Sequence, residues 1–170
     1  MNYKQQIVQE IDPKDGVIRE WHRLNGRLHR EETEGPVFTI SDLETGRIHV
    51  ERYYRHGKIY REKGPAVVKR TTEGVTVYVA YKRYGLFHRN PEEGPAWIER
   101  NRSGTVVTME GWLLYDEAYR HPDAGPWCIQ RCPETGRITS EQYLTLNQFA
   151  ELGRPQRRCP RVSSAKPFPK

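Results

Sequence analysis

Residues 25–36 read NGRLHREETEGP, and similar stretches recur at residues 56–65 (HGKIYREKGP), 84–95 (YGLFHRNPEEGP) and 115–126 (YDEAYRHPDAGP). The Gly-Pro step that ends each stretch returns with spacings of 29, 30 and 31 residues. A second glycine series opens each unit, at Gly16, Gly46, Gly74, Gly104 and Gly136. A fixed period of this size indicates a repeat architecture. The pattern divides the chain into units near 16–45, 46–73, 74–103 and 104–135, with a half-unit at 136–145.

The turns within each unit are those of β-hairpins. Asn25-Gly26 joins two short segments of strand-forming residues, and both positions of such a two-residue turn must accept positive φ. His56-Gly57 stands at the same place one unit later. Strand formers fill the segments between turns, as in residues 75–81, VTVYVAY. We therefore expect an all-β fold, an antiparallel meander of about ten strands built from four hairpin repeats of about 30 residues.

Two further features of the meander follow from side-chain chemistry. Proline cannot donate to a strand ladder, so the Gly-Pro steps should kink or bulge every second strand. Aromatic residues recur about once per unit, and on neighbouring strands they should stack as cross-strand pairs. These residues are Trp21, Tyr53, Tyr54, Tyr81, Trp112 and Tyr143.

One short helix is expected, near the end of the repeats. Thr145 and Gln148 fit a capping box, and Phe149 and Leu152 supply a small apolar face. Gly153 then favours a stop. A helix of about seven residues would cap the last repeat, as terminal units of repeat arrays require.

Composition narrows the class of protein. The 170 residues are 35% hydrophobic and 29% charged, and no stretch approaches the ~18 consecutive apolar residues of a membrane span. The first 14 residues lack the apolar core of a secretory signal. Three cysteines are too few for a disulfide scaffold. We expect a soluble, cytoplasmic protein with one repeat domain at 1–150.

The positive charge is concentrated in residues 151–170, a proline-rich tail. The chain carries a net charge of +6. The tail contains six basic residues and one acidic residue, so most of this charge lies there. Such a terminus is either a solvated arm or a segment that contacts phosphates or an acidic partner. A nucleic-acid-binding function would rest on this arm, through Arg154, Arg157, Arg158, Arg161, Lys166 and Lys170.

The repeated unit resembles the tandem NGxLHRxxGPA repeats of phage, giant-virus and bacterial proteins, which are related to MORN repeats. The resemblance covers residues 16–145 and is best at Asn25–Arg30 with Gly35-Pro36, Gly57–Arg61 with Gly64–Ala66, and Gly85–Arg89 with Gly94–Ala96. It implies a β-hairpin array with a scaffold or binding role and no reaction. It also suggests a phage or mobile-element factor, an inhibitor that acts on a host complex.

Four arginines hold the same place in the four units: Arg30, Arg61, Arg89 and Arg120. A ladder of guanidinium groups would grip phosphates or carboxylates, whereas an arginine that stacks on a repeat aromatic is part of the scaffold. The fourth unit departs most from the pattern, which makes Trp112, Tyr115 and Trp127 candidate partner-binding residues alongside the arginines.

No motif in the chain indicates catalysis. His29 and His88 alternate with Tyr60 and Tyr119 at the matching place, so this position favours an aromatic-sized polar ring over a metal ligand. We expect no catalytic residue, metal or cofactor.

The leading hypothesis is a non-catalytic protein that binds a protein partner by occlusion or scaffolding. Nucleic-acid binding through the tail is the alternative. A membrane-surface adaptor ranks last, because the chain has neither a basic amphipathic helix nor a lipidation motif. The open edges of the meander also allow self-association.

Overall fold

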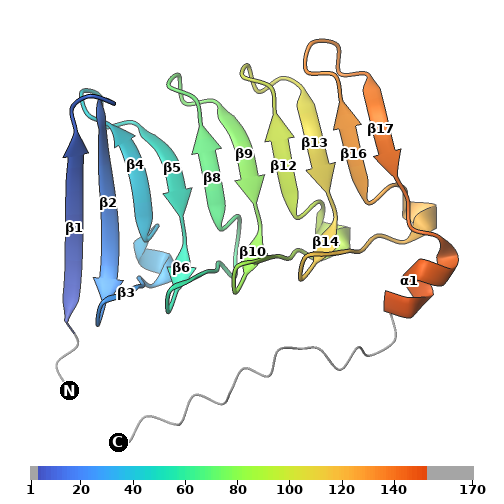
Figure 1. The fold of residues 1–170 in the computed structure, drawn as a ribbon, viewed down its shortest axis with the longest axis horizontal. Helices are drawn as coiled ribbons and strands as arrows, with labels where there is room; N and C mark the ends of the chain where they lie inside the picture. The colour runs from blue at the N-terminus through green and yellow to red at the C-terminus, as the bar shows by residue number, and fades with distance from the viewer. Residues whose placement is uncertain (1–3, 153–170) are drawn as a thin grey trace, which may run out of the picture.

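The computed structural model describes residues 4–152, and one antiparallel sheet extends from the first strand of this range to the last (Figure 1). Its main strands lie side by side in sequence order, each antiparallel to the next. They are β1 (Gln5–Asp12), β2 (Val17–Leu24), β4 (Phe38–Asp42), β5 (Ile48–Arg52), β8 (Val67–Arg70), β9 (Thr76–Ala80), β12 (Trp97–Arg100), β13 (Val107–Gly111), β16 (Cys128–Arg131) and β17 (Ile138–Gln142). The expected meander of about ten strands is thus confirmed.

A short hairpin follows every second main strand, along the lower edge of the sheet in Figure 1. β3 (Arg27–Leu28) pairs with the end of β2, and the later hairpins form separate two-stranded ribbons. These are β6 (Tyr54–Arg55) with β7 (Lys58–Ile59), β10 (Lys82–Arg83) with β11 (Leu86–Phe87), and β14 (Leu113–Leu114) with β15 (Glu117–Ala118). In three units a 3₁₀ turn then leads to the Gly-Pro step: η1 (Glu32–Glu34), η2 (Pro91–Glu93) and η3 (Pro122–Ala124).

The short hairpins keep their turn geometry even where the glycine is lost. Asn25, His56 and Tyr84 have φ values of 50 to 55°, and a glycine with positive φ follows each of them. In the fourth unit Tyr115 (φ 53°) is followed by Asp116 (φ 67°). Aspartate tolerates the left-handed region better than most residues, so the hairpin survives the substitution. The Asp116 side chain also accepts a hydrogen bond from the Phe87 backbone N–H in the preceding unit (2.6 Å).

The bulges lie far from the Gly-Pro steps, so the expected link between them is wrong. Gly-Pro comes just before a main strand begins, and the ladder does not need the missing proline N–H there. The register instead shifts at the other end of the strand, near the turn that follows. The shifts fall between Ile40/Ser41, Lys69/Arg70, Glu99/Arg100 and Gln130/Arg131, whereas the β1–β2 pair runs without one.

The sheet has two faces, which we name by their side chains. Cross-strand register places Trp21, Phe38, Tyr78, Trp97 and Met109 on one side, the tryptophan face. Tyr53, Tyr81 and Trp112 each follow a residue of that side and therefore point to the other side, which we call the arginine face.

Burial is concentrated near the lower ends of the main strands. Val37, Ala66 and Ala96, the residues after Gly-Pro, are 0 to 1% exposed. The short hairpin and the start of the next main strand pack closely at this end of the sheet, and small side chains fit there.

Trp97 occupies a slot formed by two small residues on neighbouring strands. It pairs with Ala80 on β9 and with Gly111 on β13. A Cβ atom built on Gly111 would lie 1.9 Å from the Trp97 ring. Gly111 is therefore required for close approach, because its backbone lies directly against an indole.

The C-terminal helix α1 (Leu146–Leu152) forms where the capping box predicts it. The Gln148 backbone N–H donates to Thr145 Oγ1 (3.2 Å), and the Thr145 N–H donates to Gln148 Oε1 (2.8 Å). Phe149 lies on the Tyr119 ring, with centroids 5.2 Å apart, and also contacts His121. The helix thus caps the last unit, as expected.

Gly111→Ala should destabilise the fold by about 1–3 kcal/mol, because the added methyl group forces the Trp97 ring out of its slot. Urea denaturation of the variant and the wild-type chain measures this loss. The double variant Trp97→Val/Gly111→Ala is the matched control, since it recreates the Val67–Ala80 pair of the preceding unit. It should be more stable than Gly111→Ala alone. An equal or lower stability would contradict the slot.

Candidate binding surfaces

Each of the four repeated arginines is bonded to the Gly-Pro step of its own unit. Its Nη1 donates to the backbone carbonyl of the proline: Arg30 to Pro36 (3.2 Å), Arg61 to Pro65 (3.2 Å), Arg89 to Pro95 (3.2 Å) and Arg120 to Pro126 (2.7 Å). This bond ties the end of a short hairpin to the start of the next main strand.

An aromatic ring lies under the guanidinium group in three of the units. The distances from Cζ to the ring centroid are 3.8 Å for Arg61 over Tyr53, 3.9 Å for Arg89 over Tyr81 and 3.7 Å for Arg120 over Trp112. In the first unit Arg30 instead lies 3.3 Å from His22 Nε2. These rings thus stack on arginines and not on one another, so the expected cross-strand aromatic stack is wrong for them.

The Gly-Pro glycine packs close to the same guanidinium group. A Cβ on Gly94 would meet Arg89 Nη1 at 3.0 Å, and its φ of 122° is a conformation that only glycine adopts readily. Arg89 is therefore packed between the Tyr81 ring and Gly94. The geometry accounts for the recurrence of the four arginines as part of the scaffold, with the Nη1 donor of each directed at a backbone carbonyl.

A second set of rings links each unit to the next. His29 stacks on His56 with centroids 4.6 Å apart and planes within 8°. The corresponding rings of the later units meet at tilted angles of 41 to 50°: Tyr60 with Tyr84 (5.1 Å), His88 with Tyr115 (4.1 Å) and Tyr119 with Phe149 (5.2 Å). Sequence analysis aligned the first rings of these pairs but did not predict their partners. Those partners are His56, Tyr84 and Tyr115 at the hairpin turns and Phe149 on helix α1. The signal was present, because positions 56, 84 and 115 all carry a ring.

The three candidate residues of the fourth unit have different environments. Trp112 is only 8% exposed and lies beneath Arg120. Trp127 is half-buried on the arginine face, and its carbonyl accepts from the Trp112 N–H (2.8 Å). Tyr115 is 47% exposed at the lower edge. Of the three, Tyr115 presents the most surface to a partner.

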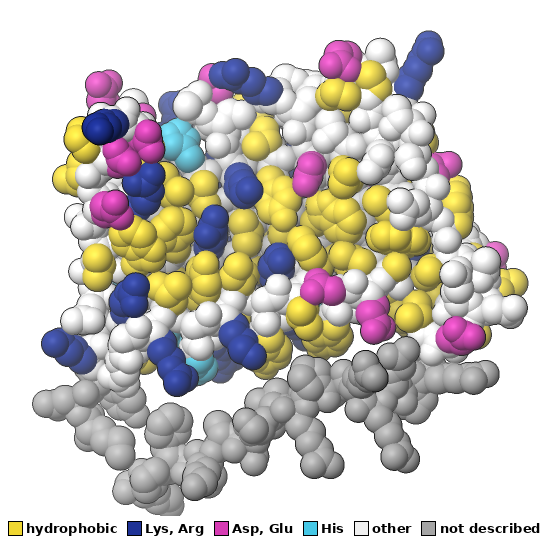
Figure 2. Space-filling view, in the orientation of Figure 1, with side chains coloured by type: hydrophobic (Ala, Val, Ile, Leu, Met, Phe, Trp, Pro, Cys, Tyr) yellow, Lys and Arg dark blue, Asp and Glu magenta, His cyan; other side chains and the backbone are white. Residues whose placement is uncertain are grey.

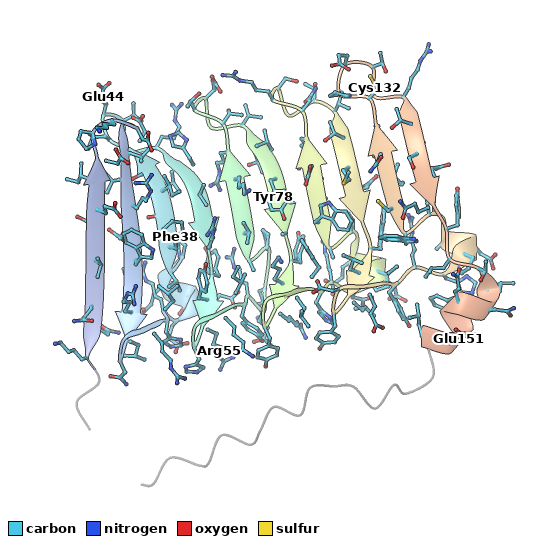
Figure 3. All side chains as sticks on the ribbon, viewed as in Figure 1. Phe38, Glu44, Arg55, Tyr78, Cys132 and Glu151 are labelled. Carbon is cyan, nitrogen blue, oxygen red and sulfur yellow. The ribbon has the colours of Figure 1, made fainter. Side chains whose placement is uncertain are left out.

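The tryptophan face carries an apolar band, crossed by basic side chains, that sequence analysis did not identify. Figure 2 shows hydrophobic side chains gathered across the middle of the sheet. Trp21 contacts Phe38 (centroids 5.4 Å apart), and Trp97 contacts Phe87 from the short hairpin (5.6 Å). Tyr78, labelled with Phe38 in Figure 3, extends the set. The sheet is a single layer, and no second sheet covers this band in the described part of the chain (Figure 1).

Basic residues gather at the short hairpins of the first three units. Arg27, Arg55, Lys58 and Arg83 belong to these hairpins, and none forms an ion pair with any other described residue. Figure 3 labels Arg55 at this edge, and Figure 2 shows the basic groups at its left end and acidic groups toward its right end. We call these four residues the basic edge. The basic edge therefore makes one part of residues 1–150 basic, although most of the net positive charge of the chain lies in the tail.

The thiols of Cys128 and Cys132 have different surroundings. Burial raises the pKa of the Cys128 thiol, and the Cys132 thiol donates to Glu134 (2.9 Å). Across residues 4–152 no group of three His, Cys, Asp or Glu side chains is placed to hold a metal ion. No helix in the same range is long and apolar enough to cross a membrane. The six basic tail residues, Arg154 to Lys170, lie outside the described residues.

No family model, curated protein or solved structure matches this chain. The resemblance to NGxLHRxxGPA repeats therefore stays a prediction from the residues that carry it.

Arg89→Ala should lower the free energy of unfolding by about 2 kcal/mol, because it removes the stacking on Tyr81 and the bond to the Pro95 carbonyl. Arg102→Ala is the matched control, since the Arg102 side chain is 83% exposed and makes only a surface ion pair with Glu73. Urea denaturation should show little change for this control. Equal losses in the two variants would contradict the scaffold role.

The histidine rings make stability depend on pH. Burial lowers the pKa of both His56 and His88, and neighbouring positive charge lowers them further. These two rings therefore bind a proton less readily in the folded chain than in the unfolded chain. Their contribution to the free energy of unfolding is complete above the ordinary pKa of about 6.5 and declines as the pH falls below it. We expect a lower melting temperature at about pH 5.5 than at about pH 7.5.

Tyrosine stands at the equivalent positions of other units, so the double variant His56→Tyr/His88→Tyr is the natural control for this pH effect. It keeps a ring at each position and removes both titrations. The difference in melting temperature between the two pH values should shrink in this variant. An unchanged difference would assign the pH dependence to other groups.

Proposed function

We propose that the protein is a non-catalytic binding protein whose tryptophan face engages a protein partner, by occlusion or scaffolding. The observation that supports this most is the apolar band on a face that no second layer covers. Phe38 is only 8% exposed, whereas Trp21, Tyr78, Trp97 and Met109 are partly exposed. Apolar patches that reach the surface of a domain commonly mark interaction sites. Trp, Tyr, Met and Arg are the residue types enriched at such interfaces, and this face carries all four.

The aromatic side chains of this face are held in place before any partner arrives. Trp97 is confined between Ala80 and Gly111 and packs against Phe87. Fixing such a side chain on binding costs little further entropy, which is a property of strong interface anchors.

The charges on the tryptophan face indicate which partner surface fits it. The guanidinium group of Arg52 lies 5.1 Å from the Phe38 centroid, and Lys69 Nζ lies 4.9 Å from that of Tyr78. Neither cation forms an ion pair with another described residue. A complementary partner would place apolar groups on the band and carboxylates over these two cations.

Met109→Lys tests this proposal, because it introduces a charge into the middle of the band. Thr108→Lys is the matched control, since it adds the same charge on the same strand but on the arginine face. Proteins captured from a lysate by the wild-type chain should be lost by at least about tenfold with Met109→Lys and retained with Thr108→Lys. Melting curves confirm that both variants are folded. Equal capture by the two variants, or no specific capture by the wild-type chain, would overturn the proposal.

Nucleic-acid binding is a second candidate function, favoured by the basic edge. Arg27, Arg55, Lys58 and Arg83 lie beside the exposed rings of His56 and Tyr84, and some single-strand binders combine cations with stacking rings in this way. Phosphate contacts of this kind weaken steeply with salt.

Fluorescence anisotropy with labelled single- and double-stranded DNA and RNA tests this candidate over a series of salt concentrations. The full chain is compared with a 1–150 truncation and with a variant that carries Gln at all four basic-edge positions. Loss of binding in the truncation would assign the contact to the tail, and loss in the Gln variant would assign it to the basic edge. Flat curves for the full chain would exclude the candidate.

A further inference from the structure

Among residues 4–152, no strand pairs with the outer side of β1, which forms one edge of the sheet. Lys4 and Asn25 exchange backbone and side-chain hydrogen bonds (Asn25 N–H to the Lys4 carbonyl, 3.0 Å; Lys4 N–H to Asn25 Oδ1, 3.1 Å). Even-numbered residues of β1 therefore direct their backbone groups toward β2. By alternation, the N–H and C=O groups of the odd-numbered residues point away from the sheet. These are Gln5, Ile7, Gln9 and Ile11.

β1 has none of the features that usually protect an edge strand. It is eight residues long, as long as any strand of the structure, and its sequence QQIVQEID contains no Lys and no Pro. Its pairing with β2 has no bulge, whereas every later main hairpin has one. Proteins normally use lysines, prolines, bulges or short strands to prevent edges from pairing.

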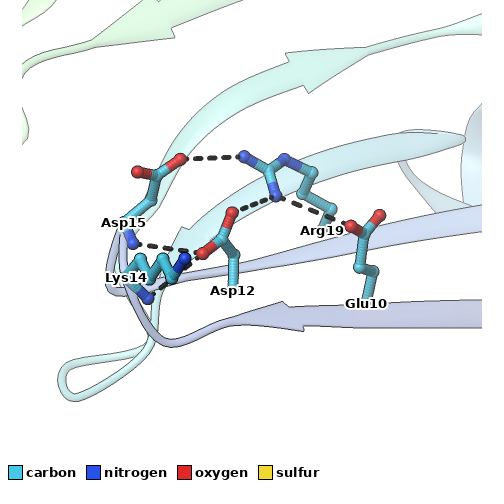
Figure 4. Close-up of polar contacts among 5 residues, drawn as sticks. All are labelled: Glu10, Asp12, Lys14, Asp15 and Arg19. Carbon is cyan, nitrogen blue, oxygen red and sulfur yellow. Dashed lines mark hydrogen bonds and ion pairs between the residues drawn. The ribbon is translucent and has the colours of Figure 1, made fainter.

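The acidic groups of β1 protect it only weakly, because Arg19 on the neighbouring strand offsets part of their charge (Figure 4). Arg19 on β2 contacts Asp12 (3.2 Å), Asp15 (3.3 Å) and, at 4.0 Å, Glu10. The backbone N–H of Asp15 and the Arg19 guanidinium lower the pKa of Asp12. Arg19 therefore offsets part of the negative charge at this end of the hairpin.

Exposed isoleucines line one side of this edge. Ile7 is 64% exposed and Ile11 is 59% exposed, and they lie four residues apart with Gln9 between them. All three side chains project to the same face, because strand side chains alternate. The arrangement is symmetric about Gln9.

We propose that two copies of this chain pair through β1, antiparallel and about a two-fold axis at Gln9. Antiparallel pairing must oppose residues that both direct their backbone groups outward, so odd positions face odd positions. The register centred on Gln9 places Ile7 of each copy opposite Ile11 of the other. Two isoleucine pairs are buried, and Ile7, Gln9 and Ile11 form about six new backbone hydrogen bonds. The sheets of both copies then continue as one.

The other end of the sheet does not offer an equivalent site for head-to-tail growth. β17 is five residues long, and α1 places Phe149 on the ring where a following unit would stack. The symmetric β1 contact is therefore preferred over an open filament. Such a contact closes after two copies.

The double variant Ile7→Lys/Ile11→Lys tests the contact, because it places lysines opposite each other at both pairs. Both side chains are largely exposed in the single chain, so the variant should fold. Light scattering after size exclusion, over a series of protein concentrations, should show dimers of the wild-type chain. The variant should stay monomeric, with dimer dissociation raised by about tenfold or more.

The variant Ile7→Lys/Ile11→Glu tests the register. With the two-fold axis at Gln9, each introduced lysine faces an introduced glutamate, so dimers should return at low ionic strength and weaken with salt. Failure of this variant to restore dimers would overturn the register. A monomeric wild-type chain at every concentration, or growth beyond two copies, would overturn the pairing itself. Melting curves of both variants confirm folding.

Discussion

The arginine packed between an aromatic ring and a Gly-Pro step is the interaction on which the rest of the structure depends. A single-layer sheet buries little on its faces, so it lacks the thick core that fixes most domains. Here the lower ends of the strands are fixed locally. Arg61, for example, stacks on Tyr53, contacts Gly64 and bonds the Pro65 carbonyl. One side chain thus joins a main strand, a short hairpin and the start of the next unit.

The hairpins, their period and the capping helix could be predicted because their signals are local. Asn25-Gly26 specifies a turn, and Thr145 with Gln148 specifies a helix start, whatever surrounds them. The partners of the rings could not be predicted in this way. Spacing aligns Tyr53, Tyr81 and Trp112, but whether a ring meets another ring or an arginine depends on how the short hairpin folds back. Gly111 is similar, because only the register brings it against Trp97.

Partner-binding candidates were hardest to choose from the sequence, because the surroundings of a side chain depend on how distant segments fold together. An aromatic residue that recurs in a repeat is equally consistent with packing and with recognition. Trp112 belongs to the unit that departs most from the pattern, and yet it is buried under Arg120. The apolar band of the tryptophan face was missed because its members come from two separate places in the repeat. Phe38 and Trp97 follow the Gly-Pro step, whereas Tyr78 and Met109 precede the arginine-face ring, and only cross-strand register brings these places onto one face.

The edge and the face are geometrically linked. In the proposed dimer Gln9 opposes its own copy, so the two-fold axis is perpendicular to the sheet and equivalent faces lie on the same side. Both tryptophan faces would therefore form one surface of twice the length. Engagement of both halves by one partner would raise avidity by about 10²–10⁴ without any new contact within either half. The edge variants Ile7→Lys/Ile11→Lys would then weaken capture of a two-fold symmetric partner, although no substituted residue lies in the band.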